Sequence, residues 1–294
     1  MPMLSKTQKG LLACIASQGL WGSGILFWPL LAYLNTLSIL SLRIICSFVF
    51  AIILISRTKR FQLVKKLFTE KKIRASLILA SAFIAGNWGV YTYAINSGKA
   101  IEVSLGYYLT PLMSIALGRI FFNDVLNRNQ LTAIFIVVCG VSYGIVSYGD
   151  IPYYGFAIGF TFAVYGFLHK IINADAISIL CAETLILLPF SLAWLFLAEP
   201  DYGFAHYPFK HYLLLLGTVF YTGIPLMLFS FATVTVRFTT IGFILYTAPS
   251  INFLLAVFYT HETIKTSDYV TFPLVWIALL IYTLDMIYKN KKAR

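Results

Sequence analysis

The chain has 294 residues and a formal net charge of +11, and 60% of its residues are hydrophobic while 11% are charged. Soluble proteins carry about 25% charged residues, and a soluble domain this apolar would aggregate through its surface. The composition therefore excludes an ordinary soluble domain and indicates an integral membrane protein. Its apolar runs do not alternate as membrane β-strands do, so we predict an all-α fold.

Ten apolar segments follow one another along the chain. A helix of about 20 apolar residues crosses the hydrocarbon core, so a chain of this length has room for roughly ten crossings. The first segment follows Lys6 and Lys9, as in a signal peptide, but it is too long for a leader and lacks a cleavage site of small residues. We predict helices at 10–31, 36–56, 73–95, 101–121, 130–148, 153–170, 176–198, 211–231, 237–258 and 269–288.

The basic residues lie almost entirely on one side of the predicted spans. Of 22 Lys and Arg residues, only Lys99, Lys210 and Lys265 fall in loops on the other side, and Arg43 lies inside a span. Cytoplasmic loops carry the excess of Lys and Arg, so we expect both termini in the cytoplasm. Basic loops facing anionic lipid also account for the net charge, and we therefore expect no nucleic-acid partner.

The fourth predicted helix carries a polar seam. Small and polar residues recur every four positions and share one face, at Glu102, Gly106, Thr110, Ser114 and Gly118. Pro111 removes a backbone donor at mid-depth and loosens the helix. We expect such a helix to line a pathway or to pack closely on a neighbour.

A similar pattern returns in the second half of the chain. A proline precedes an acidic residue by 13 positions in both halves, at 111–124 and at 249–262. Five spans in each half would make the second half enter from the opposite side, which is the inverted repeat typical of secondary transporters. We predict two inverted five-helix repeats, residues 1–148 and 149–294, around a central cavity. A chance match in apolar sequence is the alternative.

Four charged residues lie in the predicted spans or at their ends: Arg43, Glu102, Glu183 and Arg237. A charge at the bilayer centre costs about 2.5–3.5 kcal/mol or more, so each needs a partner. Arg43 and Glu183 enter from opposite ends and are too far apart in depth to pair. We predict two symmetry-related pairs, Arg43–Glu102 and Glu183–Arg237, one at each mouth. Three interpretations stay open: pairs that open and close as gates, static pairs, or charges that reach the headgroups.

Polar and aromatic residues near the Gly and Pro interruptions are candidates for the cavity, because such interruptions at matching places in two halves mark transporter binding regions. Asn87 needs a hydrogen-bond partner, which is either a neighbouring helix or a wet cavity. An aromatic cavity with few charges suits a flat, amphipathic, largely uncharged solute. The candidate cavity residues are Trp21, Asn87, Trp88, Tyr91, Tyr107, Tyr108, Thr110, Pro111, Tyr165, Tyr221, Tyr246 and Pro249.

The sequence lacks the motifs of catalytic and metal sites. The four His and four Cys residues show no metal-ligand spacing, no GxxxxGK[ST] loop indicates ATP binding, and no GxSxG or SxxK indicates a nucleophile. We therefore expect no metal, no cofactor and no catalytic residue.

One stretch resembles a known family. GNWGVYTYAINSGKAIEVSLGYYLTPLMSIALG, at 86–118, is similar to the RarD branch of the EamA-type permeases in the drug/metabolite transporter superfamily, as are the segments at 20–31, 182–190 and 239–262. The resemblance implies two five-helix repeats around a central cavity in the bacterial cytoplasmic (inner) membrane. Thr110 departs from the family's asparagine, which implies a different specificity if that position contacts substrate. The family-like positions are Trp21, Asn87, Trp88, Glu102, Tyr107, Pro111, Glu183, Tyr246 and Pro249.

We expect a secondary transporter of a small organic metabolite or drug that works by alternating access. Proton-coupled export through Glu102 and Glu183 is one mode, and facilitated diffusion or exchange of an amino acid or nucleoside-type metabolite is the other. The rivals are a membrane-embedded lipid-modifying enzyme, a sensor or partner subunit, and a channel. The expected partners are a small-molecule substrate and the lipid bilayer, with a homodimer left open.

Overall fold

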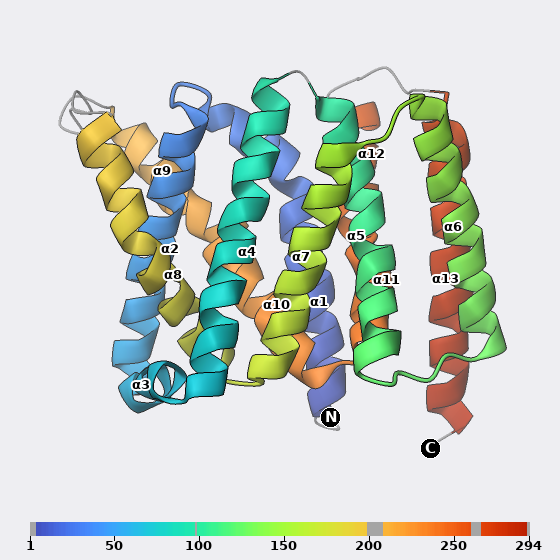
Figure 1. Ribbon diagram of the computed structural model, residues 1–294, viewed down its shortest axis with the longest axis horizontal. Helices are drawn as coiled ribbons and strands as arrows, with labels where there is room; N and C mark the ends of the chain where they lie inside the picture. The colour runs from blue at the N-terminus through green and yellow to red at the C-terminus, as the bar shows by residue number, and fades with distance from the viewer. Residues whose placement is uncertain (1–3, 98, 199–207, 260–265, 293–294) are drawn as a thin grey trace.

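The computed structural model describes residues 4–97, 99–198, 208–259 and 266–292. Over these ranges every regular element is helical, and the helices stand side by side as a bundle (Figure 1). The start of the first helix and the end of the last lie at the same end of the bundle, which we call the N/C end; the opposite end is called the far end.

The main helices are α1 (Lys6–Gly22), α2 (Thr36–Thr58), α3 (Phe61–Thr69), α4 (Lys71–Asn96), α5 (Ala100–Phe121), α6 (Arg128–Tyr148), α7 (Tyr153–Ile172), α8 (Ala176–Ala193), α9 (Phe209–Tyr221), α10 (Gly223–Thr235), α11 (Phe238–Leu245), α12 (Thr247–Phe258) and α13 (Asp268–Lys292). Short turns of helix follow α1 and α8: η1 (Ser23–Leu26), η2 (Trp28–Leu31) and η3 (Trp194–Ala198).

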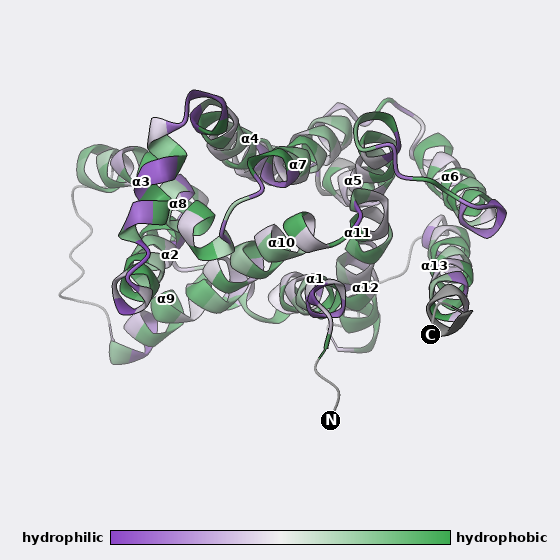
Figure 2. Cartoon of the chain, turned by 90° about the horizontal axis from the view of Figure 1, so that it is seen from below, coloured by the Kyte–Doolittle hydropathy of each residue, from purple (hydrophilic) through white to green (hydrophobic). Residues whose placement is uncertain are grey.

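Eight helical segments of the described chain are long and apolar enough to cross a membrane: Thr36–Thr58, Lys71–Tyr91, Arg128–Tyr148, Tyr153–Ile172, Ala176–Leu197, Phe209–Thr235, Phe238–Phe258 and Asp268–Tyr288. Large apolar side chains such as Phe135 and Phe190 are exposed, at 68% and 73%. Seen from the N/C end, hydrophilic residues gather on α3 and on the loops, whereas the helices are mostly apolar (Figure 2). The chain is therefore a multi-pass helical membrane protein, as the composition predicted.

Local sequence sets the starts of two helices that later matter for the site. The Asn35 side chain accepts a hydrogen bond from the Ser38 backbone N–H at 2.8 Å and caps α2. The Asp175 side chain accepts from the Ser178 N–H at 3.0 Å and caps α8. The first N–H groups of a helix have no partner inside the helix, so such a cap stabilises it by about 1 kcal/mol.

Three of the predicted spans are interrupted. The α-helix predicted at 10–31 ends at Gly22, and the chain continues through η1 and η2. Pro29 contributes no backbone N–H there, and the Ser23 hydroxyl donates to the Leu20 carbonyl at 3.0 Å, so the regular ladder is lost.

The segments predicted as single helices at 211–231 and 237–258 each form two helices. The first breaks at Thr222 and the second at Tyr246. A proline occupies the third position of each following helix, Pro225 in α10 and Pro249 in α12. Proline disfavours helix in the residue before it and has no N–H to donate, so a new helix starts there at little cost. Pro111, by contrast, lies inside an unbroken α5.

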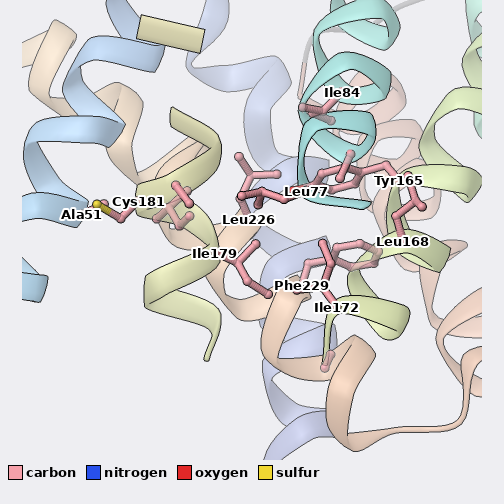
Figure 3. Packing of buried hydrophobic residues seen from close by; sticks show 14 of the residues in the cluster. Ala51, Leu77, Ile84, Tyr165, Leu168, Ile172, Ile179, Cys181, Leu226 and Phe229 are labelled. Atoms are coloured by element: carbon pink, nitrogen blue, oxygen red, sulfur yellow. The ribbon is translucent and has the colours of Figure 1, made fainter. Parts of the chain in front are cut away.

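Side chains from both halves of the chain build the main core. Leu77, Tyr165, Ile179 and Phe229 meet there from α4, α7, α8 and α10 (Figure 3). Residues from the first and the second half of the chain therefore share one hydrophobic core.

Candidate functional site

The guanidinium of Arg43 lies against aromatic rings about two turns into α2 from the far end. Its central carbon is 4.0 Å from the ring centre of Trp88 on α4 and 5.4 Å from that of Trp28 on η2. Tyr91 and Tyr107 lie close enough to interact with it electrostatically. We call these five residues the Arg43 cluster. Arginine over a tryptophan face gains about 0.5–2 kcal/mol, depending on how far both are desolvated.

Arg43 has no anionic partner in the described part of the chain. The salt bridges found there involve other residues, and the buried Arg43 Nε has no hydrogen-bond partner. Glu102, with which the sequence predicted a pair, has its side chain outside the described residues, so that pair stays a prediction. A cation inside a membrane span is costly unless it is paired, so among the described residues the surroundings of Arg43 favour an added anion.

Aromatic contacts extend the Arg43 cluster into the second half of the chain. Tyr221, at the end of α9, stacks on Phe27 with ring centres 4.4 Å apart and contacts Trp28 at 6.0 Å. Tyr107 on α5 stays 45% exposed although it lies about two turns inside its helix. Tyr107 is therefore only partly covered by the neighbouring helices.

A second polar group lies toward the N/C end. Glu183 on α8 is 3% exposed, and one of its oxygens is 2.7 Å from His169 Nε2. The Tyr165 hydroxyl donates to the other oxygen at 3.1 Å. We call Tyr165, His169 and Glu183 the Glu183 cluster. It links α7 to α8 through side chains that are all buried.

The predicted Glu183–Arg237 pair is not formed in this structure, because each residue has another partner. Arg237 Nε lies 3.6 Å from an Asp124 oxygen, and its guanidinium also donates to the Val125 carbonyl. Asp124 further accepts from the backbone N–H and the hydroxyl of Thr239, each at 2.9 Å. These residues lie where α5 leads into α6 and α10 into α11, so Arg237 meets an acid from a loop at its own level.

An aromatic layer lies beside the Glu183 cluster. Trp21 at the end of α1 contacts Phe162 and Phe229 at ring-centre distances of 5.6 and 5.9 Å. Phe229 in turn stacks with Tyr165 at 6.2 Å. Tyr165 and Phe229 are at most 1% exposed, so this layer fills the space between α1, α7 and α10.

Asn87 links two helices. Its amide nitrogen donates to the Ile158 carbonyl and to the Thr161 hydroxyl, both at 2.9 Å, and the residue is 7% exposed. Both partners lie on α7. Of the two interpretations that the sequence left open, this geometry favours the contact between neighbouring helices.

Most of the remaining predicted cavity residues lie on α5 or contact it, and Pro249 lies on α12, which packs on α1. The Tyr246 hydroxyl donates to the Tyr108 carbonyl at 3.0 Å, and both side chains are buried. The Thr110 hydroxyl donates within its own helix to the Gly106 carbonyl. Pro111 is buried and Pro249 is half-buried.

The glycines of the seam also face neighbouring helices. A Cβ on Gly106 would lie 2.9 Å from the Gly155 carbonyl oxygen of α7, and one on Gly118 would lie 2.7 Å from the Thr239 nitrogen of α11. The polar seam of α5 is therefore a close-packing face at these positions.

Sequence reasoning missed two members of these groups. His169 lies four residues after Tyr165 on α7 and so shares its face, a spacing that could have pointed to it. Trp28 lies in a short turn where no helical period applies, and no sequence signal marked it. The described residues hold no group of three or more His, Cys, Asp or Glu side chains that could bind a metal ion.

Comparisons with known proteins agree with this architecture. A model of the EamA-like transporter family matches residues 8–144. Protein RarD of Salmonella typhimurium is 34% identical, and the uncharacterized transporter YojE of Bacillus subtilis is 36% identical, each over 98% of both chains. A solved crystal structure superposes with a TM-score of 0.74 over 94% of this chain and 96% of its own, at 14% identity, and therefore shows the fold alone.

Proposed function

Since the chain belongs to the RarD-type branch of the EamA-like transporter family, we propose that this membrane permease carries a small organic metabolite or drug across the bacterial cytoplasmic membrane by alternating access. The family and the names of the relatives indicate a transporter and not an enzyme. The basic loops support an orientation with both termini in the cytoplasm, which makes the N/C end the inner end.

Exchange of packing partners supports two inverted five-helix repeats. Counting α1 and α5 with the eight apolar segments gives ten spans. In the first half, α4 and α5 both pack on α7, the first helix of the second half. In the second half, their counterparts α10 and α11–α12 pack on α1, the first helix of the first half. The contacts α2–α8, α5–α11 and α6–α13 join each helix to its own counterpart. An axis that exchanges the halves, 1–148 and 149–294, would produce this pattern.

The observation that carries the mechanism is the difference between two equivalent positions. Glu183 has both oxygens bound and lies beside a filled aromatic layer, whereas Arg43 has no anionic partner among the described residues and lies near the exposed Tyr107. We take this as a state closed toward the inner end and open toward the far end. In the alternate state the Glu183 cluster would separate and the far end would close.

A labelling experiment tests this mechanism. In a protein without its native cysteines, Tyr107→Cys in membrane vesicles of known orientation should react with an impermeant maleimide from the far side only. Adding Glu183→Ala should open the inner end and allow reaction from that side. Tyr93→Cys, exposed at the far end of α4, is the matched control and should not respond to Glu183→Ala. If Tyr107→Cys stays unreactive from the inner side when Glu183 is replaced, the Glu183 cluster is not the inner closure.

Transport itself is tested with a ligand found by thermal shift. A ligand at 100 times its Kd stabilises by about 2.7 kcal/mol. The panel holds amino acids, nucleosides, phenicol drugs and aryl carboxylates. A stabilising ligand should enter proteoliposomes that contain the protein and stay outside protein-free liposomes. A ligand that binds and never crosses would contradict the permease mechanism.

Proton coupling is a second candidate, because Glu183 and His169 are titratable and share a buried hydrogen bond. A pH gradient across the proteoliposome should then drive accumulation, and Glu183→Gln should abolish that drive while leaving downhill flux. If the pH gradient has no effect on substrate flux in the unmodified protein, transport is by facilitated diffusion or exchange and not by proton coupling.

A further inference from the structure

We propose that the Arg43 cluster binds the carboxylate of a substrate that has one negative charge and a flat, apolar body. This inference rests on the proposed permease function and names the substrate class of its site. It departs from the largely uncharged solute that the sequence suggested, because the structure shows how the Arg43 charge is placed.

Arg43 differs from the other cations that lie inside or beside the bundle. Lys170 donates to the carbonyls of Thr233 and Val236 at 3.0 and 2.7 Å. Arg237 pairs with Asp124, and Arg60 lies 2.6 Å from Asp175. Over the described ranges Arg43 has ring faces around it and no anionic partner, and its buried Nε–H lacks the hydrogen bond that a buried donor needs.

The geometry of the cluster leaves a place for such a partner. Trp88 covers the guanidinium at 4.0 Å through its ring face, which attracts the charge but accepts no directed pair of hydrogen bonds. A carboxylate accepts two parallel N–H bonds from the guanidinium fork. Tyr107 beside the cluster remains 45% exposed, and we take this partly uncovered side as the route by which a solute reaches Arg43.

Rings around the charge define the rest of the substrate. Trp28, Trp88 and Tyr221 come from η2, α4 and α9 and lie in one chain of contacts with Arg43. Aromatic faces bind flat apolar groups by stacking and edge contacts. A phosphate monoester would bring nearly two charges to one guanidinium, so a monocarboxylate fits the single described cation better.

The test uses indole-3-acetate and its uncharged amide, indole-3-acetamide, at equal ionic strength. Binding to the detergent-purified full chain is measured by thermal shift and by isothermal titration calorimetry. The acetate should bind at least about 10-fold more tightly than the amide, because the amide lacks the charge that strengthens bidentate bonds. Equal binding of the two, or binding of neither, would overturn the proposal.

Variants identify Arg43 as the residue responsible. Arg43→Gln should remove the preference for the acetate, and Arg43→Lys should keep a reduced preference, since a lysine offers the charge without the fork. Arg57→Gln, an exposed arginine on the same helix, should leave it unchanged. A full preference in Arg43→Gln would refute the proposal. If Arg43→Gln does not fold, Arg43→Lys provides the test. An unchanged preference for the acetate in Arg43→Lys would show that the two-pronged hydrogen bonding of the guanidinium does not hold the carboxylate.

A Glu102 variant is a further part of the test. If the acetate bound only after Glu102→Gln, the Glu102 carboxylate would be the partner of Arg43 in the native protein and the proposal would fail.

Transport measurements separate this inference from the permease mechanism. A neutral solute that crosses proteoliposomes while the acetate does not bind would refute the substrate class alone. An acetate that binds through Arg43 and never crosses would refute the permease mechanism alone.

Discussion

Arg43 and Glu183 occupy equivalent positions on α2 and α8, each eight residues after the side chain that caps its helix. Helix α2 begins at the far end and α8 at the N/C end, so the two charges lie at similar depths from opposite ends (Figure 1). Their surroundings differ, since Glu183 is bound by two side chains and Arg43 is flanked by rings. The two positions thus match in their distance from the capping residue and differ in their environment, as one state of the proposed alternating-access cycle would require.

Removing the imidazole of the Glu183 cluster should destabilise the protein. In His169→Ala a buried carboxylate oxygen loses its partner, which costs about 1–3 kcal/mol. Tyr165→Phe removes one hydrogen bond and keeps the ring, so it should cost less, about 0.5–1.5 kcal/mol. The midpoint of thermal unfolding in detergent measures both. A His169→Ala protein as stable as the unmodified one would show that the contact carries no net stability.

The contact between α5 and α11 should not tolerate a methyl group. A Cβ on Gly242 would lie 2.5 Å from an Ile115 side-chain atom and 3.0 Å from the Pro111 carbonyl oxygen. Gly242→Ala should therefore lower stability by about 1–3 kcal/mol, as overpacking does. Gly86 on α4 is the control, because a Cβ added there would meet no other atom within 4 Å. Gly86→Ala should be neutral or slightly stabilising, since alanine favours helix more than glycine does. Thermal unfolding of the two variants side by side gives the comparison; equal midpoints would contradict the predicted clash.

Asp124 should hold the start of α11. Asp124→Asn keeps the size of the side chain but weakens the bonds to Thr239 and the attraction to Arg237. Hydrogen bonds to a charged group are worth about 1.5–3 kcal/mol, so the first turn of α11 should exchange its amide hydrogens faster. Asp150→Asn, at an exposed loop position, is the control and should leave α11 unchanged. Unaltered exchange in Asp124→Asn would show that packing alone anchors that turn.

The orientation of the chain can be measured with single cysteines. Lys59→Cys, between α2 and α3, and Lys210→Cys, at the start of α9, are both exposed and lie at opposite ends of the bundle. In cells the second should react with an impermeant maleimide from outside, and the first only after the membrane is opened. The four native cysteines are replaced beforehand, since Cys139 is exposed. The reverse pattern would place both termini outside.

Several features of the fold could be predicted because they depend on short stretches of chain. Apolar length indicates which segments can cross a membrane, and this placed the starts of the long helices to within a few residues. It missed the short α3 and did not show that the first helix ends at Gly22. A helix N-cap depends on one side chain and the backbone N–H three residues later, as at Asn35 and Asp175. The breaks at Thr222 and Tyr246 were not placed, although the prolines that follow them were visible, because proline also fits unbroken helices such as α5.

Sequence by itself determined that this chain is a helical membrane protein of a known transporter family, since composition and local motifs carry that information. Only the tertiary structure decided which polar groups meet. It paired Glu183 with His169 and Arg237 with Asp124, and it placed Arg43 against Trp88. The physical reason is that a buried charge pairs with a group that helix packing brings to the same depth in the bundle. The depth of each side chain and the direction in which it points depend on contacts between helices that are far apart in the sequence.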